Sequence, residues 1–282
     1  MTHCPDYLYH YTSINTLGLI LKNRNIRFNN LTALDDLDER RQSGGNYGKY
    51  CFISSWTDKR EDNISMWKMY SDDMKGVCIK MRSHPFVEHE IDAQDIGNNR
   101  LFAGGRIGES GKIKSLVLLE ELYNSNYMFY LRDNSRLLYK VEYNDLTYLE
   151  QFKQSSILEK FDNGIISLNG NLLGKVKNNF WKFQQEWRYI LLIYPLDPDA
   201  MNDKERYLNE LNRIQKLEDL HSEGKPLTDY FLTLKDEALE TMEIQLGPKT
   251  NDIDEEIVSL LLKKYNPTAA DNISKSDLQG RV

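Results

Sequence analysis

Hydrophobic and polar residues follow a strand pattern at the start of the chain and then change to a helical pattern. Residues 7–12, YLYHYT, are rich in aromatic side chains, as β-strands are, and Ser13 stands where a helix N-cap is expected. The positions that would form one face of the following helix are Ile14, Leu17, Gly18 and Leu21. We therefore predict a strand over 7–12 followed directly by a helix.

The same two periods predict further elements. Strands are predicted over 49–57, 75–81, 136–144, 186–194 and 241–247, with a short edge strand over 25–30. Helices are predicted over 64–70 and 149–161, while 116–131 is helical or mixed and 178–185 is a helix end or loop. A last helix would bury one face made of Ile253, Ile257, Leu260, Leu261 and Tyr265.

Polar stretches between these elements predict loops and one insertion. Residues 31–48 are acidic and end in glycines, which favours a solvated loop. Residues 83–115 are glycine-rich without a period, which favours a flexible surface loop, with a mobile lid as the alternative. Residues 201–223 are predicted to form a charged helical excursion with one apolar stripe. The polar tail 267–282 is expected to fray.

Strands and helices do not alternate regularly along the chain. We predict an α+β fold with mixed, mostly antiparallel split sheets flanked by helices. The 282 residues are compatible with a single elaborated domain over 1–266, followed by the tail.

Composition narrows the class of protein. A net charge of −7 argues against sequence-blind coating of nucleic acid, although a local basic groove stays possible. The three cysteines are scattered, which is typical of core thiols in a reducing cytosol. We find neither a signal-peptide pattern nor an apolar run of roughly 20 residues, so we expect a cytoplasmic protein without a membrane partner.

Common catalytic signatures are absent from the sequence. There is no phosphate-binding loop, no dinucleotide-binding glycine motif, and neither HExxH nor GxSxG. The segment HPFVEHE at 84–90 holds two histidines and two glutamates, but the spacing of His84 and His89 and the intervening Pro85 are poor for a shared metal. We favour a solvated loop there and predict no metal.

Three short segments remain that carry reactive or polar side chains. They contain His10 in the first strand, Ser54 and Ser55 in the second, and Glu186 at the start of a late buried strand. Each also has a structural explanation. A strand histidine is more often a hydrogen-bonded core residue, the serines can end a strand, and Glu186 can simply pair with Arg188.

Several longer segments resemble a bacterial domain-of-unknown-function family, number 2971, over most of the chain up to about residue 265. They are LYHYTSINTLGLILKNRNIRFNN (8–30), YCFISSWT (50–57), ISMWKMYSDDMKGVCIKM (64–81), FWKFQQEWRYI (180–190) and MEIQLGPK (242–249). The first segment is also similar to the start of ADP-ribosyltransferase-like proteins. Domains of this family look like relatives of that fold and occur in phage-defence or toxin settings.

The resemblance implies residue roles and NAD as substrate. It gives His10 the first-strand role, Ser54 or Ser55 the second-strand role, and Glu186 the late glutamate, with Gln184 directing the acceptor. NAD would contact His10, Tyr11, Thr12, Ser55, Trp56 and Gln184, while Glu186, His10 and Ser54 would act in catalysis. A carboxylate beside the ribose would stabilise the oxocarbenium-like charge that develops as the glycosidic bond breaks.

Two functions are therefore expected. The first is an ADP-ribosyltransferase-like enzyme that consumes NAD and modifies a protein or nucleic acid as a toxin or phage-defence effector. The second is a catalytically silent module of the same fold that binds a nucleotide or senses a partner. A nuclease or another glycosyl-bond cleavage is a further alternative. The acidic segment 35–39 either is solvated or lines the same cleft.

Overall fold

The computed structural model describes most of the predicted core of the chain. The described residues are 4–37, 39, 47–59, 62–92, 112–118, 121, 127–129, 137–145, 158–160, 166–168, 173–195, 203, 205–206, 209 and 227–282. Most of the helical excursion predicted at 201–223 and of the helix predicted at 149–161 lies outside these residues, as do positions 93–111 of the predicted loop.

Short strands outnumber helices. The strands are β1 (Tyr7–Thr12), β2 (Asn25–Asn30), β3 (Cys51–Thr57), β4 (Val77–Arg82), β5 (His89–Asp92), β6 (Lys112–Ser115), β7 (Tyr127–Phe129), β8 (Leu138–Lys140), β9 (Glu142–Asn144), β10 (Leu158–Lys160), β11 (Ile166–Leu168), β12 (Val176–Asn178), β13 (Glu186–Pro195), β14 (Asp229–Thr233), β15 (Glu243–Leu246) and β16 (Ile273–Lys275). The helices are α1 (Ile14–Asn23), α3 (Ile64–Tyr70), α7 (Asp236–Glu240) and α8 (Asp252–Tyr265), with 3-10 turns η1 (Leu31–Ala33), η2 (Tyr47–Tyr50), η4 (Asn179–Gln184) and η6 (Pro267–Ala269).

Capping residues explain where the helices begin. The Ser13 side chain accepts from the backbone N–H of Thr16, as predicted for the start of α1. Asn63 caps α3 in the same way. At α8, Asn251 and Asp254 form a reciprocal capping box. These local signals fix the helix starts independently of the sheet.

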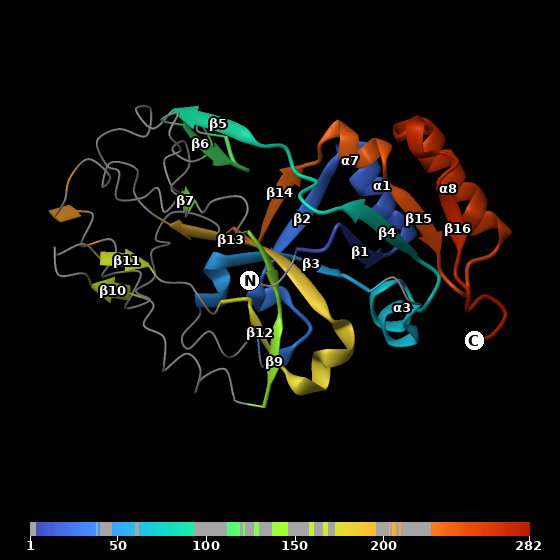
Figure 1. The fold of residues 1–282 in the computed structure, drawn as a ribbon, viewed down its shortest axis with the longest axis horizontal. Helices are drawn as coiled ribbons and strands as arrows, with labels where there is room; N and C mark the ends of the chain where they lie inside the picture. The colour runs from blue at the N-terminus through green and yellow to red at the C-terminus, as the bar shows by residue number, and fades with distance from the viewer. Residues whose placement is uncertain are drawn as a thin grey trace.

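The principal sheet is mostly antiparallel and branches at β3 (Figure 1). In the described part of the chain it has ten strands, with the continuous order β14-β2-β3-β1-β4-β15-β16. Strand β13 pairs with one edge of β3 along the whole length of β3, from Cys51 to Thr57. On the other edge of β3, β2 pairs near the beginning of the strand and β1 pairs only at its end. Two strands thus share one edge of β3 and diverge between their pairing points.

The two faces of the sheet carry different cores. On one face, α1, α7 and α8 cover the large apolar cluster that includes Leu17, Phe28 and Val258 (Figure 1). On the other face, α3 covers a small cluster made of Tyr11, Trp67, Met74 and Cys78. Because side chains alternate along β1, this strand contributes to both faces.

The structure confirms the predicted α+β class with mostly antiparallel pairing. The strand over 7–12 and the helix over 64–70 have the predicted bounds, the helix α1 begins directly after Ser13 as predicted, and the buried strand begins at Glu186 as expected. The predicted strand over 136–144 is instead two short strands, because β8 pairs with β13 whereas β9 pairs with β12.

Other predictions were wrong. The 25–30 strand is not an edge strand, because β14, which the sequence analysis did not identify, pairs along it. Residues of the tail do not all fray: β16 pairs in parallel with β15, and Ala269 and Ser276 are buried. Residues 158–160, placed in a predicted helix, form strand β10.

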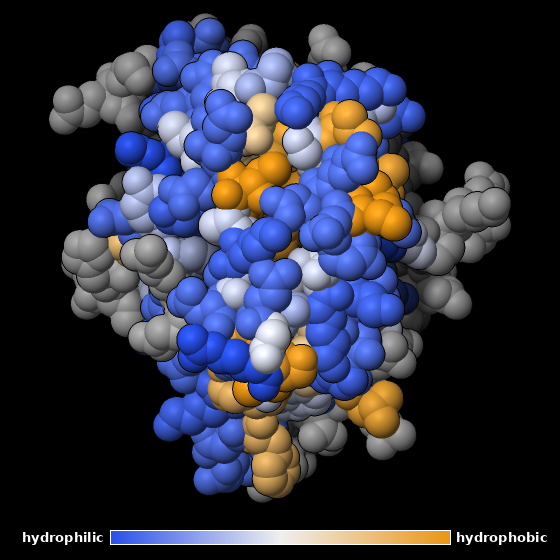
Figure 2. All heavy atoms as spheres, turned by 90° about the vertical axis from the view of Figure 1, so that its right-hand side faces the viewer, coloured by the Kyte–Doolittle hydropathy of each residue, from blue (hydrophilic) through white to orange (hydrophobic). Residues whose placement is uncertain are grey.

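Helix α8 buries only part of the face predicted for it. Val258 and Leu262 are buried, whereas Ile253 is 68% exposed and Leu260 is 58% exposed. Leu261 and Tyr265 of the predicted face pack, partly buried, against the core, and the Leu261 methyl groups lie 3.5 Å from where a Cβ of Gly18 in α1 would stand. Figure 2 looks onto this side of the molecule, where hydrophobic patches lie among hydrophilic residues.

No helix in the described part of the chain is long and apolar enough to cross a membrane.

Candidate functional site

The point at which β1 leaves β3 is closed by a side chain. Tyr9 pairs with Thr57, and antiparallel pairing would continue two residues on, between Tyr11 and Ser55. That pair does not form. The His10 ring reaches across instead, and its Nδ1 lies 2.8 Å from the Ser55 carbonyl oxygen. This hydrogen bond satisfies a backbone acceptor that the interrupted ladder would otherwise leave unpaired.

The hydrogen bond also fixes the state of the histidine. A carbonyl oxygen only accepts, so Nδ1 must carry the hydrogen. Burial lowers the pKa of His10, and the Ser55 carbonyl offsets only part of that effect. The ring is therefore neutral at neutral pH, and its Nε2 carries a lone pair.

Strand β13 supplies a glutamate and an arginine to one face of the sheet. Glu186 lies opposite Thr57 and Arg188 lies opposite Ser55, so the four side chains share a face. The Arg188 Nε is 2.7 Å from Glu186 Oε1, and its NH2 group is 3.0 Å from Oε2. The two residues form a side-on, two-point ion pair.

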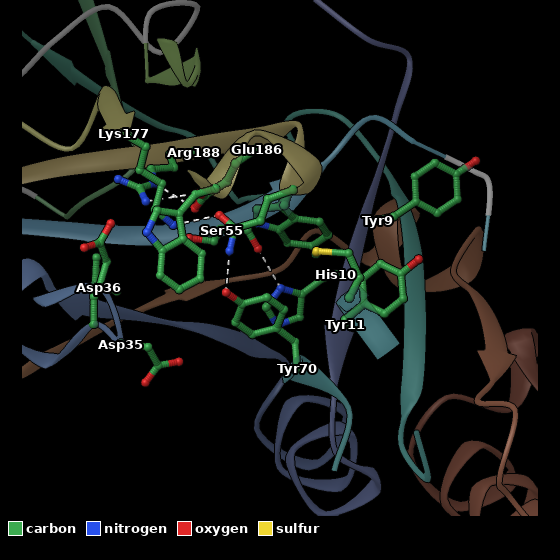
Figure 3. A pocket seen from close by; sticks show the side chains of 15 residues that line it. Tyr9, His10, Tyr11, Asp35, Asp36, Ser55, Tyr70, Lys177, Glu186 and Arg188 are labelled. Atoms are coloured by element: carbon green, nitrogen blue, oxygen red, sulfur yellow. Dashed lines mark hydrogen bonds and ion pairs between the residues drawn. The ribbon is translucent and has the colours of Figure 1, made fainter. Parts of the chain in front are cut away.

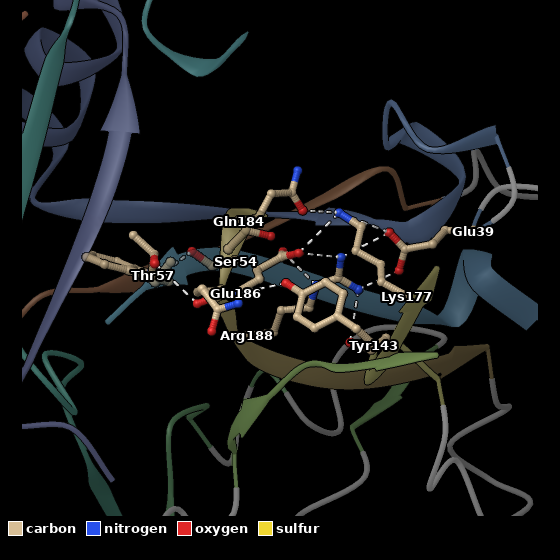
Figure 4. A network of polar contacts seen from close by, with 12 residues as sticks. Glu39, Ser54, Thr57, Tyr143, Lys177, Gln184, Glu186 and Arg188 are labelled. Carbon is tan, nitrogen blue, oxygen red and sulfur yellow. Dashed lines mark hydrogen bonds and ion pairs between the residues drawn. The ribbon is translucent and has the colours of Figure 1, made fainter. Parts of the chain in front are cut away.

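Two further charged residues complete a buried network (Figure 4). Glu39 accepts from both terminal nitrogens of Arg188, at 2.5 and 2.9 Å. Lys177 Nζ lies 3.1 Å from Glu186 and 3.6 Å from Glu39. All four residues are less than one-tenth exposed. Two carboxylates and two cations therefore alternate in a site that excludes most water.

Mutual pairing keeps Glu186 and Arg188 ionised despite burial. Burial alone would raise the pKa of Glu186, but Arg188 and Lys177 outweigh it and lower the pKa to about 2. Burial alone would lower the pKa of Arg188, but Glu186 and Glu39 raise it well above its ordinary value. Removing one member would leave a buried charge without compensation.

The Glu186 carboxylate has its acceptor capacity filled. It receives two hydrogen bonds from Arg188, one from Lys177 at 3.1 Å and one from the Ser55 side chain. A carboxylate offers about four lone-pair directions. Its own backbone N–H donates to the Tyr143 hydroxyl at 2.8 Å. Glu186 is thus fixed in position and can contact a further donor only if one of these four yields.

The network forms one wall of a pocket of about 120 Å³ (Figure 3). The other walls come from β1, α3, η4 and the acidic segment that follows η1. The lining residues are Tyr9, His10, Tyr11, Leu34, Asp35, Asp36, Ser55, Trp56, Met66, Tyr70, Lys177, Trp181, Gln184, Glu186 and Arg188. Five aromatic side chains surround a charged patch, an arrangement suited to a flat ring joined to a polar group.

The pocket gathers most of the predicted site residues. Those that line it are His10, Tyr11, Ser55, Trp56, Gln184 and Glu186. Ser54 does not, and its hydroxyl instead accepts a 3.0 Å hydrogen bond from the Trp56 indole. Thr12 is buried opposite Val77, away from the pocket. Of the two serines left open by the sequence, Ser55 is therefore the one beside Glu186.

Five residues of the pocket and its network were missed or assigned another role. The segment 35–39 was favoured as solvated, yet Asp36 and Glu39 are buried, and Asp35 and Asp36 line the pocket. Lys177 and Tyr70 were not identified as site residues. Tyr70 lies in a segment that carried the family resemblance, whereas nothing in the local pattern around Lys177 distinguishes it from a surface lysine.

A second, larger groove of about 510 Å³ lies along β1, β4, β15 and β16 and shares Tyr9 with the pocket. Its residue Asp62 joins three parts of the chain. One carboxylate oxygen accepts from the Trp67 indole at 2.8 Å, and the other accepts from the Ser276 hydroxyl and the Asp277 backbone N–H. Asp62 thereby ties helix α3 to the segment that follows β16.

The histidine-rich segment 84–90 lies away from the pocket lining. Phe86 is buried against the main core and His89 begins β5. The His84 Nε2 is 3.7 Å from the Cys4 sulfur. Among the described residues, no three His, Cys, Asp or Glu side chains are grouped so that they would hold a metal ion.

The fold and the pocket define an α+β protein with a charged, aromatic-lined site at a sheet branch. Residues 66–189 match the model of a family described as "Protein of unknown function (DUF2971)". This match supports the resemblance to that family and covers Tyr70, Lys177, Glu186 and Arg188, whereas His10 and Ser55 precede it. No curated protein matches the chain, and no solved structure does.

Proposed function

We propose that the chain is an ADP-ribosyltransferase-like enzyme that binds NAD in this pocket and cleaves its glycosidic bond. The observation that carries the proposal is the convergence of His10, Ser55 and Glu186, from three strands, on one aromatic-lined pocket. These are the positions to which the family resemblance gives the histidine, serine and glutamate roles. The ADP-ribose would pass to a macromolecular acceptor or to water.

Each residue has a chemical task in this proposal. Glu186 would face the ribose, where a carboxylate stabilises the positive charge that develops as nicotinamide leaves. Ser55 hydrogen-bonds to that carboxylate and holds its orientation. Tyr11, Trp56 and Trp181 line the pocket and offer faces for stacking on the nicotinamide ring.

Catalysis would require Lys177 to release Glu186. Since four donors fill the Glu186 carboxylate, a ribose hydroxyl needs one of them to move. Lys177 has an alternative partner, because Glu39 Oε2 lies only 3.6 Å from its Nζ. A shift of Lys177 towards Glu39 would free one acceptor position on Oε2, which still accepts from Arg188, without leaving a buried cation unpaired.

The filled carboxylate also favours a second candidate function. A catalytically silent module would bind NAD or another nucleotide in the pocket and use the Glu39–Arg188–Glu186–Lys177 network only as structural support. Such a protein would signal binding to a partner rather than consume NAD. The convergent pocket suits both functions, so turnover separates them.

The test is NAD consumption by the purified protein, measured by chromatography with and without cell lysate as a source of acceptor. The wild type is compared with Glu186→Gln and His10→Ala, and growth of expressing cells is followed in parallel. An enzyme would lose at least about a hundredfold in NAD cleavage on Glu186→Gln, because the charge facing the ribose is removed.

Glu255→Gln is the matched control, since Glu255 lies on α8 and pairs with Lys275 there. It should cleave NAD at the wild-type rate. Circular dichroism and thermal unfolding establish that the variants are folded. Binding of NAD by calorimetry without turnover in any lysate would reject the enzyme and support the binding module.

A further inference from the structure

A chain of hydrogen bonds fixes the polarity of one pocket wall. The Lys177 Nζ lies 2.7 Å from Gln184 Oε1, and an ammonium group can only donate. The amide oxygen of Gln184 must therefore face Lys177, which turns the amide NH2 towards Tyr70. The NH2 donates to the Tyr70 hydroxyl oxygen. Tyr70 consequently accepts in this bond and keeps its own hydrogen for another partner.

Tyr70 remains protonated and can donate that hydrogen. Burial raises its pKa, and the negative charges of Glu186 and Asp35 raise it further. In the part of the chain that the structure describes, the bond from Gln184 is the one hydrogen bond recorded at this hydroxyl. Since Tyr70 lines the pocket, a ligand acceptor is the available partner.

His10 presents the opposite polarity on the same pocket. Its Nδ1 hydrogen is used by the Ser55 carbonyl, so the neutral ring leaves Nε2 as an acceptor. No described residue is recorded as donating to Nε2. Figure 3 shows the His10 and Tyr70 rings on the side of the pocket away from Lys177 and Arg188. One donor and one acceptor thus face the pocket from β1 and α3.

We propose that Tyr70 and His10 together recognise the primary carboxamide of the nicotinamide ring, with Tyr70 O–H donating to the amide oxygen and His10 Nε2 accepting from the amide N–H. This inference rests on the proposed function and makes Tyr70 a specificity-determining residue. It also assigns His10 to the leaving group and not to a ribose or the diphosphate.

The adenine ring of NAD also presents an acceptor beside a donor, and so could pair with Tyr70 and His10 in the same way. Adenine presents a ring nitrogen acceptor beside an amino donor, as the carboxamide presents an oxygen beside an N–H. Glu186 and Ser55 line the same pocket, and their proposed task concerns the ribose that carries nicotinamide. The carboxamide is therefore the expected occupant, and the experiment separates the two edges.

The experiment is calorimetric titration of the full chain with three dinucleotides, each checked for cleavage afterwards. They are NAD, nicotinic acid adenine dinucleotide and nicotinamide hypoxanthine dinucleotide. The acid analogue replaces the amide N–H donor by a carboxylate oxygen, which faces the His10 lone pair. We expect it to bind at least about tenfold more weakly than NAD, whereas the hypoxanthine analogue binds within about threefold of NAD.

Tyr70→Phe removes the donor and keeps the ring. We expect about tenfold weaker NAD binding, and the preference for NAD over the acid analogue should fall towards one. A merely structural effect would weaken both dinucleotides equally and leave that ratio unchanged. Tyr265→Phe on α8 is the matched control and should keep both the affinity and the ratio. Thermal unfolding verifies that both variants fold.

The outcomes separate this inference from the proposed function. Equal wild-type affinity for NAD and the acid analogue, or an unchanged ratio in Tyr70→Phe, overturns the carboxamide assignment while NAD binding stands. Selective loss of the hypoxanthine analogue overturns it in favour of adenine. Failure of the wild type to bind any of the three dinucleotides overturns both proposals.

Discussion

The two edges of β1 are built in different ways. Towards β4 the ladder is continuous over six residues, from Tyr7 opposite Arg82 to Thr12 opposite Val77. Towards β3 it consists of the pair between Tyr9 and Thr57, and the His10 side chain completes the contact. The fully paired edge towards β4, the closed edge, leads to apolar packing under α7 and α8. The interrupted edge towards β3, the open edge, leads to the charged pocket. A recognition site is thus formed where a sheet stops pairing and side chains satisfy the backbone.

The largest effect is expected on the open side, from Arg188→Met. The substitution leaves Glu39 and Glu186 buried beside Lys177 alone, and we expect a loss of about 3–5 kcal/mol in the free energy of unfolding. Urea denaturation measures it. Lys80→Met on the closed side breaks the more exposed pair with Glu243 and should cost less than about 1 kcal/mol. Equal losses would mean that the buried network contributes no more to the free energy of unfolding than the exposed ion pair does.

Acid should act on the same network. The pKa of Glu186 is about 2 in the folded protein against 4.5 ordinarily, so the unfolded chain binds more protons between these values. Stability therefore falls as pH drops from about 4.5 towards 2, by about 3 kcal/mol across that window. Denaturation curves at several pH values measure the slope. Glu186→Gln should have a shallower slope there, and an unchanged slope would contradict the assignment.

On the closed side, Gly76→Ala should be the damaging substitution. A Cβ at Gly76 would stand 2.2 Å from the Thr12 carbonyl oxygen, so the backbone of β1 or β4 must shift, at about 1–3 kcal/mol. Gly18→Ala is the control, because its Cβ would meet only Leu261 methyl groups at 3.5 Å. Within helix α1 it should stabilise by about 0.5–1 kcal/mol. Thermal melts of both variants test whether the close contact governs the loss.

The smallest effect is expected at the branch point itself. His10→Phe keeps a ring beside Trp56 but removes the donor to the Ser55 carbonyl, which should cost about 1 kcal/mol. His10→Asn offers an amide N–H as an alternative donor and tests whether a shorter side chain can rescue the bond. Urea denaturation of the two variants and the wild type gives the comparison. A Phe variant as stable as the wild type would show that water donates to the Ser55 carbonyl in place of His10.

Local patterns in the sequence predicted the elements that carry the pocket. The strand with His10, the cap at Ser13 and the strand that begins at Glu186 depend on residues near in sequence, and all three were correct. The motifs also brought His10, Ser55 and Glu186 to attention before their contacts were known. Local propensity and periodicity are sufficient for the strands and the cap, whereas the roles of these three residues came from the family resemblance.

The remainder depends on contacts between distant segments. Glu39 lies 149 residues before Arg188, and an acidic segment without its partner has the pattern of a solvated loop. Lys177 is likewise defined by the two carboxylates around it and not by its neighbours. For α8, several apolar positions compete for burial, and packing against α1 selects Val258 and Leu262 over Ile253. Periodicity cannot rank such faces without the partner surface.

The three-way junction at Asp62 affects how deletion experiments on this protein are interpreted. Its carboxylate connects the segment after β16 to Trp67 on α3, and the same helix ends at Tyr70 in the pocket. Removal of Ser276 and Asp277 would therefore release the helix that supports one pocket wall. A deletion series would score these residues as essential for ligand binding, although neither lines that pocket. Point substitutions within the pocket are the more direct guide to its chemistry.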